Sequence, residues 1–316
     1  MSTLASLSKT TGRVEQEGYA FANGSCLRID GEPYQVRRPI GAGNIADVYL
    51  VRNVKTGKLF AMKHLYHDYA TDPKRYYGKL KLITTHSNPH PAFVWPLALG
   101  EYDSGSNSFC YLMPLVSDGY RPLSYAIVNP DALTRAQKLE ICRHLAEAFS
   151  KLQKIKWVYG DCSANNFLYR IDKNGKPQVK ILDCDTITQE GYSFGLSGTG
   201  RYRAPEVMLG KPLSLQSDAH ALAAVLFHLL IGCNALDGSY SSPKGMTEED
   251  ILRYYGKRPI FIFDQSGKNK PLYPHLYDRF AELPDALQAY FRVMFSQTRL
   301  TGKAPRPGPD VLYRIL

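Results

Sequence analysis

A change in the spacing of apolar residues near Gly119 divides this sequence into two parts with different secondary structure. Before it, from Cys26 to Val116, short runs rich in β-branched and aromatic residues alternate with turn signals, with one helical stretch between them. After it, apolar residues recur at helical spacing, most clearly over residues 135–153 and 219–231. The pattern predicts an α+β protein with a small antiparallel sheet followed by a mainly helical part.

The first part is expected to contain six strands and one helix. Asp72 followed by Pro73 is typical of an N-cap with proline at the first helical position, so a helix is predicted from Pro73 to about His86. The strands are predicted over residues 27–29, 34–40, 48–52, 59–64, 97–102 and 109–116. In the second part, a strand hairpin over residues 167–182, turning at Asn174-Gly175, is predicted between the two long helices.

No repeat or low-complexity linker separates the two parts, so one domain is predicted, with two lobes that meet in a cleft. Its expected divisions are an N-terminal extension over residues 1–25, an N-lobe over 26–116 and a C-lobe over 117–316. A chain of 316 residues with 44% hydrophobic residues is long enough to bury a substantial core.

Cysteine spacing, hydropathy and charge exclude several classes of protein. The six cysteines form no C-x-x-C pair, so neither a zinc site nor a compact disulfide framework is indicated, and a reducing cytoplasm fits best. The longest apolar run, over residues 219–233, contains two histidines and is too short to span a bilayer, so no membrane anchor is predicted. The net charge of +10 is dispersed along the chain, which indicates a solvated surface and no nucleic-acid partner.

Two motifs in the first part suggest phosphate binding. G-A-G-N-I-A-D-V at 41–48 lies between two predicted strands, where small residues let backbone N–H groups approach phosphate oxygens. Lys63, in F-A-M-K at 60–63, follows on the next strand and is placed to reach the α- and β-phosphates. Taken singly, a plain strand turn and a solvent-facing lysine are the alternatives.

Two acidic motifs follow in the second part. In V-Y-G-D-C-S-A-N-N-F-L-Y at 158–169, Asp161 is a candidate to orient or accept a hydroxyl proton, with Asn166 as a metal ligand. In I-L-D-C-D at 181–185, a carboxylate leaving a strand can hold Mg²⁺ between phosphates. Asp and Asn are also common turn residues, and ordinary turns remain the alternative for each motif alone.

With G-T-G-R-Y-R-A-P-E at 198–206, these motifs resemble the protein kinase signature set in order and spacing, over about residues 34–316. The resemblance implies a two-lobed kinase fold that uses ATP and Mg²⁺. Lys63 would contact the ATP phosphates, Asp161 would be the catalytic base, and Mg²⁺ would be bound by Asn166 and Asp183. Asp218 would brace the catalytic loop, and Glu206 would pair with Arg306.

The resemblance also implies an adenine pocket. Met113 would be the gatekeeper residue, and Pro114 is tolerable after it because that hinge position supplies a carbonyl, while Val116 supplies the N–H. The residues expected to bind the nucleotide are Ile40, Gly41, Gly43, Val48, Ala61, Lys63, Met113, Pro114 and Val116.

The sequence departs from the kinase pattern at four places. The H-R-D motif reads Tyr159-Gly160-Asp161, so a phosphate on Ser193, Ser197 or Thr199 would lack its usual arginine, and only Arg201 and Arg203 lie near enough in sequence to compensate. Ser163 replaces a lysine, D-C-D replaces D-F-G at 183–185, and no acid occurs between Asp72 and Glu101 to pair with Lys63. D-C-D, with the segment at 262–272, resembles a bacterial branch of the family.

The leading interpretation is a cytoplasmic Ser/Thr protein kinase with a protein substrate that the sequence does not identify. A pseudokinase that serves as an ATP-binding scaffold, and a kinase-fold enzyme acting on a small molecule, are the alternatives. Tyr specificity, oligomeric state and delivery into another cell as an effector stay open.

Overall fold

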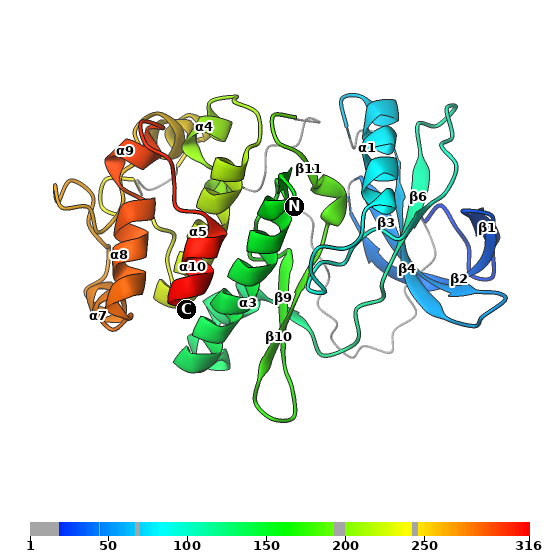
Figure 1. Cartoon of the computed structure of the whole chain (residues 1–316), viewed down its shortest axis with the longest axis horizontal. Helices are drawn as coiled ribbons and strands as arrows, with labels where there is room; N and C mark the ends of the chain where they lie inside the picture. The colour runs from blue at the N-terminus through cyan, green and yellow to red at the C-terminus, as the bar shows by residue number, and fades with distance from the viewer. Residues whose placement is uncertain (1–18, 44, 67–69, 193–199, 242–245) are drawn as a thin grey trace. The chain divides into compact units, whose positions relative to one another are not determined.

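The computed structural model describes residues 19–43, 45–66, 70–192, 200–241 and 246–316. The chain forms two compact units (Figure 1). The first comprises residues up to Asn88 together with Phe93–Tyr120, and the second comprises Pro89–Ala92 together with Arg121–Leu316.

In its described residues, the first unit is a six-stranded antiparallel sheet with one helix, α1, at Pro73–Thr85. The strand order is β1-β2-β3-β4-β6-β5. The strands are β1 Cys26–Ile29, β2 Glu32–Ala42, β3 Ala46–Asn53, β4 Leu59–Leu65, β5 Ala98–Leu99 and β6 Phe109–Met113.

Local signals explain why α1 begins where the sequence predicts. The Asp72 carboxylate accepts a hydrogen bond from Arg75 N at 2.9 Å, and Pro73 occupies the first turn. The two later strands are shorter than predicted. β6 ends at Met113 because Pro114, which follows it, has no N–H for the ladder, and β5 spans only two residues.

The second unit is mainly helical, and its described residues contain two small sheets. Its strands are β7 Arg121–Pro122, β8 Trp157–Val158, β9 Phe167–Ile171, β10 Pro177–Ile181 and β11 Thr188–Gln189, in the orders β10-β9-β7 and β11-β8. Its helices are α2 Leu123–Val128, α3 Arg135–Lys154, α4 Pro205–Met208, α5 Leu215–Ile231, α6 Glu248–Ile251, α7 His275–Ala281, α8 Asp285–Met294, α9 Gln297–Leu300 and α10 Pro309–Ile315. Short 3₁₀ turns occur at Pro130–Ala132, Cys184–Thr186 and Gly200–Tyr202, and a π-helical turn at Leu252–Lys257 follows α6.

The central helix α5 begins four residues earlier than the apolar run suggests. Ser214 and Ser217 form a reciprocal capping box at its N-terminus, so the helix starts among polar residues. Most of its side chains are buried, which is typical of a helix that is apolar on all sides. It ends at Gly232, whose φ of 92° is left-handed and whose N–H donates to His228 O.

Each unit has its own core. One face of the sheet carries a buried cluster of Ile29, Tyr34, Val36, Tyr49, Val51, Met62, Cys110 and Leu112. In the second unit, Phe227 on α5 is surrounded by the rings of Phe261, Phe263, Phe280, Phe291 and Phe295. The α+β class with an antiparallel sheet first and a helical part second is thus confirmed. Among the helices that the structure describes, none is both long and apolar enough to cross a bilayer.

Candidate active site

In the first unit, strand register places five expected nucleotide-site residues on one face of the sheet. Gly41 pairs with Val48, and Val48 pairs with Lys63. Ala61, two residues before Lys63, pairs with Met113. Directly opposed residues of antiparallel strands share a face, as do residues two apart on one strand. Lys63 is therefore aligned with the glycine segment and the end of β6, opposite the face that carries the apolar core.

The remaining expected residues of this group lie at the ends of the same strands. Ile40 is at a bulge in β2, where the register shifts between Pro39 and Gly41. Gly43 lies in the turn between β2 and β3, and its N–H donates to Ala46 O at 2.9 Å. Pro114 and Val116 follow β6 directly.

In the second unit, the loop between β8 and β9 brings Asp161 and Asn166 into contact. Asn166 Nδ2 donates to both the backbone carbonyl and the carboxylate Oδ2 of Asp161, at 3.0 Å each. Leu182, the residue before Asp183, donates its N–H to Asn166 O at 2.8 Å. The three acidic and amide groups that the sequence singled out therefore belong to two loops joined by a backbone hydrogen bond.

The donor atoms of this group suit a magnesium ion. Mg²⁺ prefers oxygen ligands, and it is commonly held by one or two side chains together with substrate phosphates. The Asn166 side chain turns its nitrogen toward Asp161, which leaves its amide oxygen for a cation, and Asp183 supplies a carboxylate. Within the described ranges, no cluster of three or more His, Cys, Asp or Glu residues forms a separate metal site.

Asp218 braces the catalytic loop, as the sequence predicts. It lies in the first turn of α5, is 2% exposed, and accepts hydrogen bonds from the backbone N–H groups of Tyr159 and Gly160. Burial raises the pKa of the Asp218 carboxyl to about 7, and the two N–H donors act in the opposite direction. These bonds fix the backbone immediately before Asp161.

Gly160 stands where the kinase motif has an arginine, and its backbone conformation favours glycine. Its φ is 83°, in the left-handed region, and a Cβ there would lie 2.8 Å from Leu213 Cδ1. Tyr159, just before it, is fully buried, and its hydroxyl donates to Leu182 O at 2.6 Å. The loop therefore has no side chain at residue 160, and the neighbouring Tyr159 donates to the backbone next to Asp183.

Two other departures also have structural roles. Ser163, at the position of the usual lysine, is 2% exposed, and its Oγ accepts from Asn166 N at 3.2 Å, so it stabilises the turn of the catalytic loop. In D-C-D, Asp183 has a φ of 49°, an uncommon left-handed conformation for a residue other than glycine. Cys184 beside it is 1% exposed.

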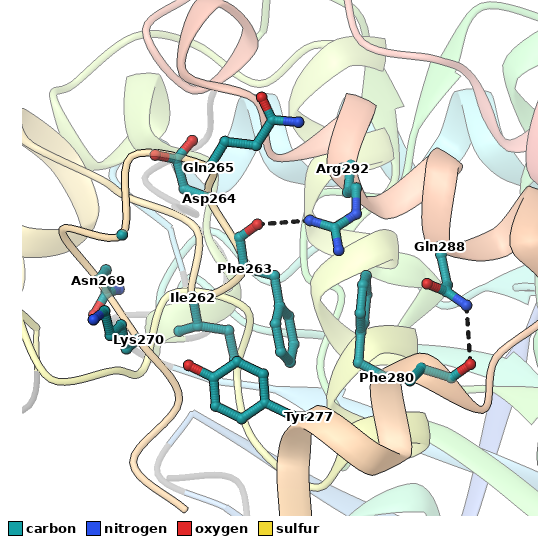
Figure 2. Close-up of a pocket in the computed structure, with 12 residues that line it drawn as sticks. Ile262, Phe263, Asp264, Gln265, Asn269, Lys270, Tyr277, Phe280, Gln288 and Arg292 are labelled. Carbon is teal, nitrogen blue, oxygen red and sulfur yellow. Dashed lines mark hydrogen bonds between the residues drawn. The ribbon is translucent and has the colours of Figure 1, made fainter. Parts of the chain in front are cut away.

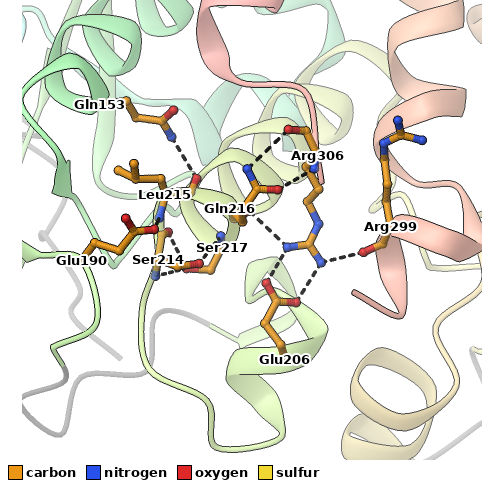
Figure 3. A network of polar contacts seen from close by, with 9 residues as sticks. All are labelled: Gln153, Glu190, Glu206, Ser214, Leu215, Gln216, Ser217, Arg299 and Arg306. Carbon is orange, nitrogen blue, oxygen red and sulfur yellow. Dashed lines mark hydrogen bonds and ion pairs between the residues drawn. The ribbon is translucent and has the colours of Figure 1, made fainter. Parts of the chain in front are cut away.

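The predicted pair between Glu206 and Arg306 is confirmed (Figure 3). Both Arg306 Nη atoms bond the carboxylate, and Nη2 also donates to Arg299 O at 3.1 Å. The Arg306 side chain is only 3% exposed, against 20% for Glu206. Gln216 on α5 accepts from Arg306 N, so the network ties α4, α5 and the segment before α10 together.

Sequence reasoning missed the groups that hold Arg201. Its Nη1 donates to Asp237 Oδ2 at 2.9 Å and to the Tyr255 hydroxyl at 3.3 Å, and Tyr255 also donates to Asp237. No sequence motif marks Asp237 or Tyr255, and no signal in the sequence could have found them. Because Arg201 already has a carboxylate partner, it is a weaker receptor for a loop phosphate than its position suggested. Ser193, Ser197 and Thr199 lie outside the described residues.

A separate cavity of about 390 Å³ lies in the second unit, away from these loops in the sequence. Phe263, Phe280 and Tyr277 form its apolar floor, and Arg292 donates to Phe263 O across it (Figure 2). Asp264, its one carboxylate, accepts from Ser266 N at 3.0 Å. None of the residues expected to handle ATP lines this cavity.

Comparison with known proteins agrees with this arrangement. Residues 34–279 match the protein kinase domain. The chain is 30% identical to the serine/threonine-protein kinase PrkC of Bacillus subtilis, covering 87% of this chain and 42% of that protein. It is 24% identical to the serine/threonine-protein kinase pkn2 of Myxococcus xanthus, covering 89% of this chain and 35% of that protein.

A similar match extends to a eukaryotic enzyme. The cGMP-dependent protein kinase of Toxoplasma gondii is 29% identical over 77% of this chain and 24% of its own length. The chain therefore spans less than half the length of each of these relatives. The matched domain covers most of the chain and contains every residue expected to bind ATP or Mg²⁺ or to catalyse the transfer, and so the chain belongs to the protein kinase domain family.

Proposed function

We propose that this chain is a Ser/Thr protein kinase, which transfers the γ-phosphate of ATP to a serine or threonine hydroxyl of a protein. The observation that carries the proposal is the braced catalytic loop, in which Asn166 holds the Asp161 carboxylate and Asp218 holds the preceding backbone. Two named Ser/Thr kinases match along nearly the whole chain and support the same specificity.

In the proposed reaction, the acceptor hydroxyl oxygen attacks the γ-phosphorus, the bond to the β-phosphate oxygen breaks, and ADP leaves. Asp161 orients the hydroxyl and accepts its proton. Asn166 and Asp183 would hold Mg²⁺, which supplies neutralisation of phosphate charge when bound, and Lys63 would contact the α- and β-phosphates. The kinase signature and the loop geometry described above support these roles.

The same proposal extends to the setting of the domain. We propose an N-terminal extension over residues 1–25, an N-lobe over 26–116 and a C-lobe over 117–316, with adenine bound beside Met113, Pro114 and Val116. The match to two bacterial kinases supports a bacterial source, and the six free cysteines support a reducing cytoplasm.

A nucleotide-binding scaffold without turnover is the second candidate. The observation that favours it is the composition of α1, which carries no acid to pair with Lys63. In this helix Lys79 is buried and stacks over the Tyr76 ring at 3.6 Å, so a cation occupies part of the buried face. Such a scaffold would bind ATP and transfer no phosphate.

The test is incubation of the full chain with Mg²⁺ and ATP labelled at the γ-phosphate, in the presence of a protein mixture, followed by phosphosite mapping. The proposal predicts label on serine and threonine residues, lost in the Asp161→Ala variant. Bound nucleotide without any transferred label would establish the scaffold instead, and label found only on small molecules would establish a small-molecule kinase.

A further inference from the structure

A segment that precedes the matched kinase domain packs on the sheet of the first unit. The rings of Tyr19 and Phe21 lie 6.0 Å and 5.5 Å from that of Tyr49, edge to face, and Phe21 also contacts His64 at 5.0 Å. Both aromatic residues pack against the apolar core of the sheet. The kinase match begins only at residue 34, so this covering belongs to the chain's own N-terminal part.

Polar groups continue from this segment into β3. Phe21 N donates to the Tyr49 hydroxyl at 3.4 Å, and that hydroxyl donates to Asp47 Oδ2 at 3.2 Å. Asp47 is 5% exposed, accepts a hydrogen bond from the backbone of Ala20, and lies beside the Tyr66 hydroxyl. Buried polar groups need hydrogen-bond partners, and the Asp47 carboxyl has them in the Tyr49 hydroxyl and the Ala20 backbone.

The network ends on the glycine loop. The Tyr66 hydroxyl lies 2.7 Å from Gly43 O and donates to it, while Tyr66 N donates to Ile45 O at 3.2 Å. Glycine gives this loop the freedom to approach phosphates, and the same freedom lets it adopt conformations that do not. A phenol that donates to Gly43 O and lies beside the Asp47 carboxyl restricts that freedom.

We infer that Tyr66 is a positioning residue for ATP: it holds the Gly43 carbonyl, and with Asp47 and Tyr49 it links the glycine loop to the N-terminal segment at residues 19–21. The inference rests on the proposed nucleotide site. The consequence is a preorganised glycine loop, so ATP binding loses less conformational entropy in ordering that loop. Tyr66 acts on neither the acceptor hydroxyl nor Asp161, so we expect its loss to change the affinity for ATP and not the rate of the chemical step.

The chain offers a matched control for a hydroxyl substitution. Tyr77 in α1 also donates its hydroxyl to a glycine carbonyl, that of Gly100, at 3.1 Å. Tyr66→Phe and Tyr77→Phe therefore remove the same chemical group from the same kind of bond, within one unit, and only the first touches the glycine loop. Tyr49→Phe removes the hydroxyl that connects Phe21 with Asp47 and keeps the buried ring.

The experiment measures hydrogen exchange over residues 40–46 without nucleotide, and then kcat and KM for ATP, in the full-length variants. Tyr66→Phe is expected to accelerate exchange and to raise KM for ATP about fivefold with little change in kcat, the range expected for one lost hydrogen bond. Tyr49→Phe should shift both in the same direction, and Tyr77→Phe should leave both unchanged.

Unchanged exchange in Tyr66→Phe, or an equal change in Tyr77→Phe, would overturn the inference. If Tyr66→Phe has an effect and Tyr49→Phe has none, the part of the inference that links the glycine loop to residues 19–21 is wrong. Because exchange is read without ATP, it tests the loop contact even if the wild-type chain transfers no phosphate, and failure of the proposed function would instead appear as absent turnover in the wild type.

Discussion

At residue 160 the backbone conformation and the packing both demand glycine. The left-handed φ would cost another residue about 1 kcal/mol or more, and the Cβ would press on Leu213, which lies directly beneath it. The sequence alone shows that an arginine is missing from the catalytic loop. The structure adds that residue 160 is left-handed and that a side chain there would begin in contact with Leu213, so this position supplies no cation to a loop phosphate.

Gly160→Ala should therefore destabilise the protein more than the same change at an open left-handed glycine. Gly210 has a φ of 86° and nothing within 4 Å of an added Cβ, so Gly210→Ala reports the backbone cost alone. We expect Gly160→Ala to lower the free energy of unfolding by at least about 1 kcal/mol more, through overpacking against Leu213. Urea denaturation measures both, and equal losses would mean that Leu213 moves aside freely.

Asp183 leads to a second prediction at this scale. Mg-ATP binding to the folded state should raise the melting temperature, because a ligand that binds only the native state stabilises it. Asp183→Ala should abolish the Mg²⁺-dependent part of the shift and keep the part that ATP produces in the presence of EDTA. A full Mg²⁺-dependent shift in the variant would remove Asp183 from the metal site.

At the scale of elements, the fold was predictable where the signal is local. Asp72-Pro73 marked the start of α1, and Asn174-Gly175 marked the turn between β9 and β10, which pair as expected. The start of α5 was missed because Ser214 and Ser217 cap it among polar residues, outside the apolar run. Tyr66 was missed because its partner is a backbone carbonyl, that of Gly43. Asp237 was missed because its partner Arg201 is distant in the sequence, and no spacing rule marks such contacts.

The link between α4 and the segment before α10 leads to a prediction about stability. Arg306 is almost fully buried, so Glu206→Gln leaves a buried cation without its charge partner and should cost about 3 kcal/mol or more. The exposed pair of Arg135 with Glu282 is the control, and Glu282→Gln should cost less than about 1 kcal/mol. Denaturant midpoints distinguish the two, and similar small losses would show that water replaces Glu206.

At the scale of the whole molecule, three largely buried histidines contribute to the response to acid. Burial lowers the pKa of His228 to about 4, and also lowers the pKa values of His64 and His220. These side chains are neutral in the folded protein at pH values where the unfolded chain protonates them. At these positions the unfolded state then binds more protons, so the histidines' contribution to stability is complete above about pH 6.5 and is lost as the pH falls toward 4.

His228→Gln isolates one member of this group. His228 Nδ1 lies 2.8 Å from the Tyr202 hydroxyl, and glutamine offers that hydroxyl a partner that does not titrate. The variant should lose less stability than the wild type between pH 6.5 and 4, by up to about 3 kcal/mol. Unfolding free energies measured across this range give the comparison, and parallel curves would mean that His228 protonates in place without penalty.

The measurement that tests the central claim most directly compares ATP affinity with phosphate transfer in the wild type and in Asp161→Asn. If Asp161 acts as the base in a kinase reaction, the variant keeps nucleotide binding close to the wild-type value and loses most of the turnover, because the residue acts in the chemical step. Wild-type turnover in the variant, or a parallel loss of ATP affinity, would contradict the assignment of Asp161 and with it the proposed mechanism.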